Sequence, residues 1–337
     1  MTQSVPQNAP PASTGGASLS QRIDAKPARR RGRRRFSLLS RRDKATLALM
    51  VGIPAFIHIF LIWLPTIGSV ILSFTDWNGI GGLDRIRWVG LKNYNTLATI
   101  YQPFWPAVQH NLMWLGAFLF IATPLGMLIA VILDQNIRGT RIYQSALYMP
   151  VVLSLAIVGF IWQLMYSPGQ GFINNALAAV TGDKAFATPG TAIDWIGTKG
   201  LNLAAILVAA GWRHVGYIMV LYLAGLKSVD PTLREAAAID GANGRQTFFR
   251  VVFPVLAPIN VVVLVVTVIE SLRAFDIVYI TNKGLNGLEL LSVLIVNNLL
   301  GEASLIGFGS ALAVVLLVIS IGPIIFYLYR TMREEPA

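Results

Sequence analysis

Long apolar segments are the feature that most restricts how this chain can fold. The first runs from about residue 45 to residue 74 and contains no Lys, Arg, Asp or Glu. A helix needs about 20 apolar residues to cross the ~30 Å hydrocarbon core of a bilayer. In lipid, a helix satisfies its own backbone hydrogen bonds. The sequence therefore predicts an all-α polytopic membrane protein.

Composition agrees with this fold class. Hydrophobic residues make up 55% of the 337 residues and charged residues only 13%, whereas soluble domains contain about 25% charged residues. The sequence has no cysteine, which excludes disulfides and thiolate metal sites. Its three histidines are scattered, so we expect no metal site and no cofactor on this chain.

We predict six transmembrane helices. The first apolar run is about twice as long as the apolar core of a secretory signal peptide, so it should remain as an uncleaved helix. Prolines within several spans are expected to bend their helices. The predicted spans are residues 46–74, 108–133, 145–166, 202–224, 254–277 and 307–329.

A basic segment precedes the first span. Residues 1–44 contain eleven Lys or Arg against two Asp, and the stretch RRRGRRR lies among them. Basic residues beside a span stay on the cytoplasmic side, so both termini are predicted to be cytoplasmic. Such a run could also bind nucleic acid, but its place directly before a span favours a role in topology or contact with anionic lipids.

The predicted organisation has three parts. Residues 1–44 form a disordered basic cytoplasmic tail, since PQNAPPASTGGAS has low complexity. Residues 45–330 form the transmembrane domain, with a cytoplasmic loop at residues 230–253 between the fourth and fifth spans. Residues 331–337 form a short cytoplasmic C-terminus.

The loop between the fourth and fifth spans has a well-marked local pattern. Asp230 can cap a helix that begins at Pro231, and Gly241 can end that helix in the left-handed conformation. Asn243 can cap a second short helix that leads into the fifth span. The sequence therefore predicts a helix–turn–helix along the cytoplasmic surface.

The first of these short helices should present a smooth, acidic surface. Ala236 and Ala237 carry little side-chain bulk, so another protein could approach the backbone closely, and Glu235 places a negative charge beside them. Phe248 and Phe249 can anchor the second helix to the ends of the spans. From composition alone, an inert connector and a docking surface for a partner explain the loop equally well.

The stretch EAAAIDGANGRQTFFRVVFPVLAP resembles the EAA loop of the membrane subunits of ATP-binding-cassette (ABC) importers. It has Glu-Ala-Ala, then Asp-Gly-Ala, an aromatic position and two spaced prolines. Segments such as SFTDWNG, WVGLKNYNTL and GYIMVLYLAGLKSVDPTLREAA resemble the carbohydrate-uptake branch, which includes maltose and glycerol-phosphate permeases. The resemblance covers most of residues 50–329. It departs from the family pattern at AVQHNLMWLG and TNKGLNG, both near the predicted outer side.

The resemblance implies a coupling role for the loop. The segment from Glu235 to Gly241 would form a coupling helix that enters a cleft on an ATPase subunit. Glu235 would meet a basic residue there, and Gly241 would form the bend. The residues that the resemblance assigns to coupling are Glu235, Ala236, Ala237, Asp240 and Gly241.

The resemblance also implies partners and a location. The sequence has no Gly-Lys dipeptide and hence no GxxxxGK[ST] phosphate loop. ATP and Mg²⁺ are therefore expected on a separate dimeric ATPase, and this chain is not expected to be an enzyme. The other expected partners are a second permease in a heterodimer, an extracytoplasmic solute-binding protein and membrane lipids, with no nucleic acid. The expected location is the bacterial cytoplasmic (inner) membrane.

Polar residues inside the predicted spans point to a substrate pathway, because charges in lipid are costly and tend to line pathways or pair with one another. The fifth span carries three charges at i, i+3 and i+6, which could form a salt-bridge ladder, or could gate or contact the cargo. The fourth span adds an arginine, a histidine and aromatic residues that suit a sugar. Its histidine alone is more typical of helix packing. The candidates are Arg213, His214, Tyr217, Glu270, Arg273 and Asp276.

The expected function is that of a permease subunit of an ATP-driven ABC importer, which moves a sugar or oligosaccharide by alternating access. Malto-oligosaccharide, a trehalose-like disaccharide and glycerol phosphate all fit the sequence. The alternative is a stand-alone secondary transporter or channel for a small polar solute, with the charged fifth span as an ion relay. A membrane enzyme has little support, since no cluster of nucleophile, base and oxyanion donors falls on one side of the membrane.

Overall fold

A computed structural model of the chain describes residues 40–135, 137–301 and 304–334. The predicted basic tail lies almost entirely outside these residues. The chain divides into two compact units, Met1–Leu61 and Ile62–Ala337. The described residues are mostly helical, and their only β pairing is an isolated bridge between Thr75 and Trp88. The predicted all-α membrane fold class is confirmed.

In the first unit, helix α1 (Arg41–His58) begins with a complete capping box. The Ser40 hydroxyl accepts from the Asp43 amide at 3.2 Å, and the Asp43 carboxylate accepts from the Ser40 amide at 2.9 Å. No side chain of α1 is buried within the chain. The helix continues through a π-helical turn (Ile59–Trp63) into α2 (Leu64–Leu72) and forms the first span.

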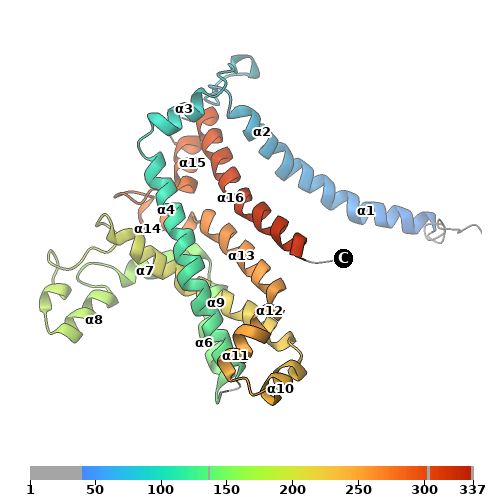
Figure 1. The fold of residues 1–337 in the computed structure, drawn as a ribbon. Coiled ribbons are helices and arrows are strands. Elements are labelled where there is room, and N and C mark those ends of the chain that lie inside the picture. The colour runs from blue at the N-terminus through green and yellow to red at the C-terminus, as the bar shows by residue number, and fades with distance from the viewer. Residues whose placement is uncertain (1–39, 136, 302–303, 335–337) are drawn as a thin grey trace, which may run out of the picture. The chain divides into compact units, whose positions relative to one another are not determined.

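Four helices in the described residues are long and apolar enough to cross a membrane on their own, namely Arg41–Leu72, Phe104–Asp134, Leu201–Ser228 and Ile306–Ile325. Two further pairs are bent, by 102° between Thr140–Val152 and Leu155–Met165 and by 75° between Gly244–Val255 and Ala257–Asn282. The predicted six spans are obtained if each bent pair counts as one. Figure 1 shows the order of the helices along the chain.

The third span is not the continuous helix predicted over residues 145–166. Helix α6 (Thr140–Val152) contains Pro150 and ends at Leu153, whose backbone is extended. Ser154 then starts helix α7 (Leu155–Met165) by accepting a hydrogen bond from the Ile157 amide at 3.3 Å. A proline followed closely by a capping serine gives the chain both a stop and a new start.

The fifth span is not the continuous helix predicted over residues 254–277. Helix α13 (Ala257–Leu272) stops at Arg273, and α14 (Asp276–Asn282) begins after a short break. The three charges at positions 270, 273 and 276 therefore do not continue along one helix.

Three π-helical turns share a cause that is visible in the sequence. They cover Ile59–Trp63, Phe118–Ala122 and Phe248–Val252. Each ends two residues before a proline, at Pro65, Pro124 and Pro254. A proline lacks the amide hydrogen and its ring collides with the carbonyl four residues back, and one widened turn accommodates both. The predicted proline bends therefore take the form of local widening at these three sites.

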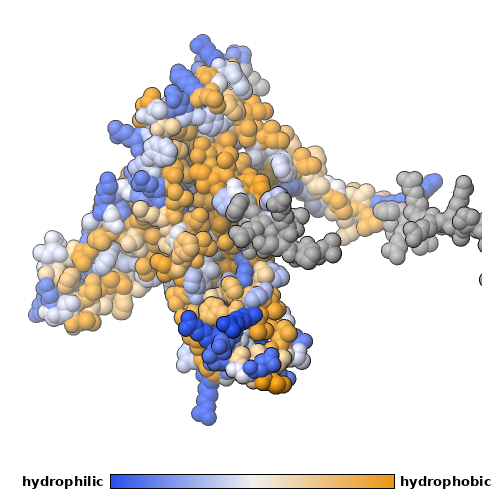
Figure 2. Space-filling view, in the orientation of Figure 1, coloured by the Kyte–Doolittle hydropathy of each residue, from blue (hydrophilic) through white to orange (hydrophobic). Residues whose placement is uncertain are grey.

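Helix α9 (Leu201–Ser228) is the centre of the second unit. It packs closely on α5 (Thr123–Asp134), where a Cβ on Gly126 would lie 2.9 Å from the Ile218 Cβ, and on α6, where a Cβ on Gly216 would overlap the Leu147 carbonyl oxygen. Hydrophobic clusters on either half of α9 bury Ile206, Ile218 and their neighbours. Figure 2 shows hydrophobic residues over much of the face drawn.

The remaining elements of the second unit either belong to the spans, as α4 and α16 do, or connect them. Figure 1 places α3 at one end of this unit and α10 at the other. These elements are η2 (Leu83–Arg85), α3 (Lys92–Thr99), α4 (Phe104–Ala117), α8 (Phe172–Thr181), η4 (Lys184–Ala187), α10 (Pro231–Ile239), α11 (Gly244–Thr247), α12 (Phe253–Val255), α15 (Leu291–Leu300) and α16 (Ile306–Glu334).

Candidate functional site

The loop between α9 and α13 has the helix–turn–helix that the sequence predicts. The Asp230 carboxylate accepts from the Thr232 amide at 2.9 Å and caps α10, with Pro231 at the first helical position. The hydrogen bonds from the Thr232 amide and hydroxyl hold the pKa of Asp230 below its usual value. This exposed cap is therefore ionised at neutral pH.

Helix α10 ends in a Schellman motif centred on Gly241, as its position in the sequence predicts. Gly241 has a φ of +77°. The Ala242 amide donates to the Ala237 carbonyl at 3.0 Å, and the Gly241 amide donates to the Ala238 carbonyl at 3.1 Å. This pair of bonds satisfies carbonyls that the helix end would leave free, and the left-handed residue between them turns the chain.

The second short helix begins as predicted, although only one of its two phenylalanines is an anchor. Asn243 and Gln246 form a reciprocal capping box with both bonds at 2.9 Å. Phe248 packs against the hydrophobic cluster between α5 and α9. Phe249 is instead 55% exposed, and the Arg245 guanidinium lies 6.0 Å from its ring centre. The prediction that Phe249 anchors the loop is wrong.

The alanines of α10 were expected to lie together on a docking surface, but the structure places them on two different faces of the helix. Ala237 is 7% exposed and lies on the inner face of the helix, so its small size serves packing within the chain. Glu235 and Ala236 lie on the exposed face. Ile239 is 86% exposed at the end of that face. Ile239 was missed in the sequence because an isoleucine among alanines suggests a buried position rather than an exposed one.

An ionic contact that the sequence did not predict joins α10 to the ends of two spans. The Arg234 Nη1 lies 2.8 Å from the Asp134 Oδ2, and the Lys227 Nζ lies 3.0 Å from the Asp134 Oδ1. The Arg234 Nη2 also donates to the Leu226 carbonyl at 3.3 Å. Only 8% of the Asp134 side chain is exposed. No sequence signal links positions separated by about one hundred residues.

Four of the six candidate pathway residues come together. Arg213, Glu270, Arg273 and Asp276 line a cavity of about 230 Å³ with Leu155. They come from α9, from the end of α13 and from the start of α14, and Leu155 opens α7. The breaks in the third and fifth spans thus bring polar groups to one place.

The charges in this cavity are paired between helices rather than along one helix. The Arg213 Nη1 lies 3.4 Å from the Glu270 Oε2, and the Arg213 Nε donates to the Leu153 carbonyl at 3.3 Å. Among the residues that the structure describes, no ion pair joins Glu270, Arg273 and Asp276 to one another. The ladder interpretation fails because α13 ends at Leu272.

His214 and Tyr217 do not line this cavity. The His214 ring is 2% exposed, stacks on Phe118 with ring centres 4.3 Å apart, and lies 3.3 Å from the Thr267 Oγ1 through its Nε2. Tyr217 packs against the hydrophobic cluster between α5 and α9. The position of His214 agrees with the packing interpretation, and neither residue joins the four charged residues in this cavity.

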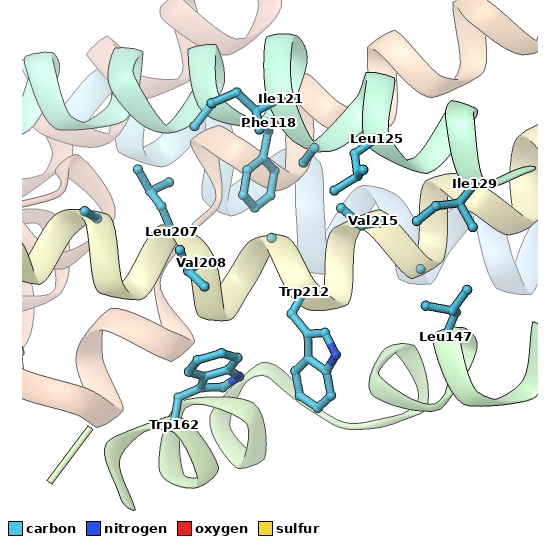
Figure 3. Close-up of a pocket in the computed structure, with 15 residues that line it drawn as sticks. Phe118, Ile121, Leu125, Ile129, Leu147, Trp162, Leu207, Val208, Trp212 and Val215 are labelled. Carbon is cyan, nitrogen blue, oxygen red and sulfur yellow. The ribbon is translucent and has the colours of Figure 1, made fainter. Parts of the chain in front are cut away.

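A second, larger hollow of about 620 Å³ is almost wholly apolar. Figure 3 shows Leu207 of α9 pointing toward Phe118 and Ile121, and Val208 of the same helix pointing toward Trp162. Its walls are aliphatic and aromatic, with Phe118, Trp162 and Trp212 among them, and offer few hydrogen-bond partners for hydroxyl groups.

Several apolar spans, an exposed capped loop and a charged cavity between helices are typical of a membrane subunit of a transport system. Residues 122–335 match the family described as "Binding-protein-dependent transport system inner membrane component". Because the match covers more than half of the chain, the protein belongs to this family, the permease subunits of ABC importers.

Curated relatives and a solved structure extend the match over most of the chain. It is 30% identical to the xylose/arabinose import permease protein XacH of Haloferax volcanii, over 84% of this chain and 87% of the relative. It is 32% identical to the osmoprotective compounds uptake permease protein GgtC of Synechocystis sp., over 83% and 96%. A chain of a bacterial alginate ABC transporter shares the fold, with a TM-score of 0.70, 21% identity and coverage of 88% and 97%.

Proposed function

We propose that this chain is a permease subunit that moves a sugar or oligosaccharide across the bacterial cytoplasmic membrane by alternating access. A separate ATPase, which holds ATP and Mg²⁺, would drive the movement. The observation that carries the proposal is the exposed face of α10, a capped helix at the end of the unit with an acidic residue and little side-chain bulk.

Coupling would occur where α10 meets the ATPase. Glu235 offers a negative charge for a basic residue of the partner, and Ala236 allows its backbone to approach closely. Asp240 and Gly241 close the helix and set the angle of the turn. Ile239 supplies an exposed apolar group that a partner cleft can bury.

The cargo would pass the cavity lined by Arg213, Glu270, Arg273 and Asp276. Guanidinium groups donate hydrogen bonds and carboxylates accept them, so the set suits several hydroxyl groups at once. Two cations and two anions balance in charge, which favours a neutral sugar over an anion such as glycerol phosphate. XacH, named for xylose and arabinose import, is consistent with this cargo class.

The assembly we propose contains a second, similar permease as a heterodimeric partner, a dimeric ATPase and an extracytoplasmic solute-binding protein. Both termini and α10 would face the cytoplasm. The absence of cysteine from the sequence makes the orientation directly testable. Ala238→Cys on α10 should react with a membrane-impermeant maleimide only in inverted vesicles. Thr191→Cys, in the loop between α8 and α9, should react only in intact cells, and the reverse pattern would refute the orientation.

The coupling role is tested by charge reversal at one position. Glu235→Lys should lower both uptake and transport-stimulated ATP hydrolysis by at least tenfold while the protein remains in the membrane, because a like charge would face the basic residue of the ATPase. Glu235→Gln keeps the shape and removes only the charge, so it should retain more activity. Normal uptake by Glu235→Lys would refute the proposal.

A further inference from the structure

The contact between Asp134 and Arg234 joins three parts of the chain at one carboxylate. Asp134 is the last residue of α5, Lys227 lies in the last turn of α9, and Arg234 lies on the inner face of α10. The Arg234 guanidinium reaches both spans at once, because its Nη1 contacts the Asp134 carboxylate at 2.8 Å and its Nη2 contacts the Leu226 carbonyl at 3.3 Å.

Apart from its packing on α11 and on the Phe248–Val252 turn, little else holds α10 in place. Of its nine residues, only Ala237 is buried. The helix is entered through Val229, whose backbone is extended, and it is left through Gly241 in the left-handed region. A short helix between two such joints would turn under an external force unless a side chain fixed it. Arg234 is the inward-facing charged side chain that does so.

The carboxylate is also connected to the cavity through rigid packing. Helix α5 and α9 are in close contact at Gly126, where no larger residue fits beside Ile218. Helix α9 in turn carries Arg213, which pairs with Glu270 in the cavity. Because α10 is fixed to Asp134, a displacement of α10 would therefore move α5 and α9 together.

We propose that Asp134 is the positioning residue that ties α10 to the spans, so that movement of α10 reaches the Arg213–Glu270 cavity. This inference rests on the proposed docking of an ATPase on α10. Asp134→Asn removes the buried charge itself, and the Arg234 side chain that it leaves behind is 37% exposed, so water can solvate it and the cost to folding is small. The loss of Asp134 should therefore be visible in coupling between sites more than in the amount of folded protein.

The test uses the assembled transporter with its ATPase and measures the accessibility of the cavity wall rather than transport of the cargo. A single cysteine at Leu155→Cys, on the cavity wall, is labelled with a maleimide with and without ATP and orthovanadate. In the parent, the labelling rate should change at least fivefold. With Asp134→Asn the change should fall below twofold, while the ATPase still co-purifies. Asp134→Glu keeps a carboxylate at this position and should retain at least half of the response.

Lys227→Ala is the matched control, because it removes a partner of the same carboxylate without touching α10, and it should keep the full response. An Asp134→Asn transporter that responds like the parent would overturn the tie while leaving the docking proposal intact. Loss of the ATPase from Asp134→Asn would also overturn it, since the residue would then shape the docking surface. A parent without any ATP-dependent change would overturn the docking proposal and the tie together.

Discussion

The loop at residues 230–253 and the charged cavity differ in how far apart in the sequence their parts lie. In the loop, Asp230 caps through a residue two positions on, and the Asn243 capping box spans three positions. In the cavity, Arg213 and Glu270 are 57 positions apart. Local hydrogen bonds give the loop its shape, whereas helix packing gives the cavity its members. The first kind of site is readable in a sequence, and the second needs the fold.

The same contrast separates the two sides of α10. Its outward face, with Glu235, follows from helix periodicity and from the caps at each end. Its inward face, with Arg234, has a function only because Asp134 ends a different helix nearby. One short helix therefore has an outward face that local sequence determines and an inward face that depends on a tertiary contact.

The largest effect is expected where helix packing determines stability, at one of two glycines on α9. Gly216→Ala should destabilise the protein by about 2 kcal/mol, because the added methyl overlaps the Leu147 carbonyl oxygen and the backbone must shift. Gly211→Ala has open space around it and should be neutral or slightly stabilising. Thermal unfolding in detergent measures both. Equal effects would mean that α6 and α9 are not packed as described.

A smaller effect is expected where local conformation alone decides. Gly241→Ala should cost about 1 kcal/mol, since an L-residue in the left-handed region is strained even though no neighbour is close. Gly244→Ala, in the next helix, has open space and should cost nothing. The difference in unfolding temperature between these variants measures the cost of placing an L-residue in the left-handed conformation at position 241. A Gly241→Ala protein as stable as Gly244→Ala would contradict the Schellman end of α10.

The smallest effect concerns the pair inside the cavity. Arg213→Met, Glu270→Gln and the double variant form a cycle whose interaction energy should be about 0.5–1 kcal/mol, because both side chains are partly exposed, at 21% and 34%. Unfolding in detergent gives the stability cycle, and uptake by Glu270→Gln tests the link to cargo. An interaction energy of zero would show that the cavity is not held by this pair.

The sequence located most of the elements but not their breaks. The apolar runs placed the spans near their observed positions, because length and hydropathy alone decide whether a helix can cross lipid. The split at Leu153 was missed because the apolar pattern continues unbroken through it. The break after Leu272 in the fifth span was also missed, and the ladder was expected because residues 270, 273 and 276 were placed on one continuous helix.

What the sequence determined by itself is local: apolar length, proline positions, and caps within a few residues of the groups they satisfy. These specified the six apolar stretches and the whole turn at Gly241, since such interactions form within one segment. The tertiary structure decided which charges meet, which alanine of α10 is buried and which carboxylate receives Arg234. Those outcomes depend on how helices pack, and packing joins residues whose separation along the chain carries no signal.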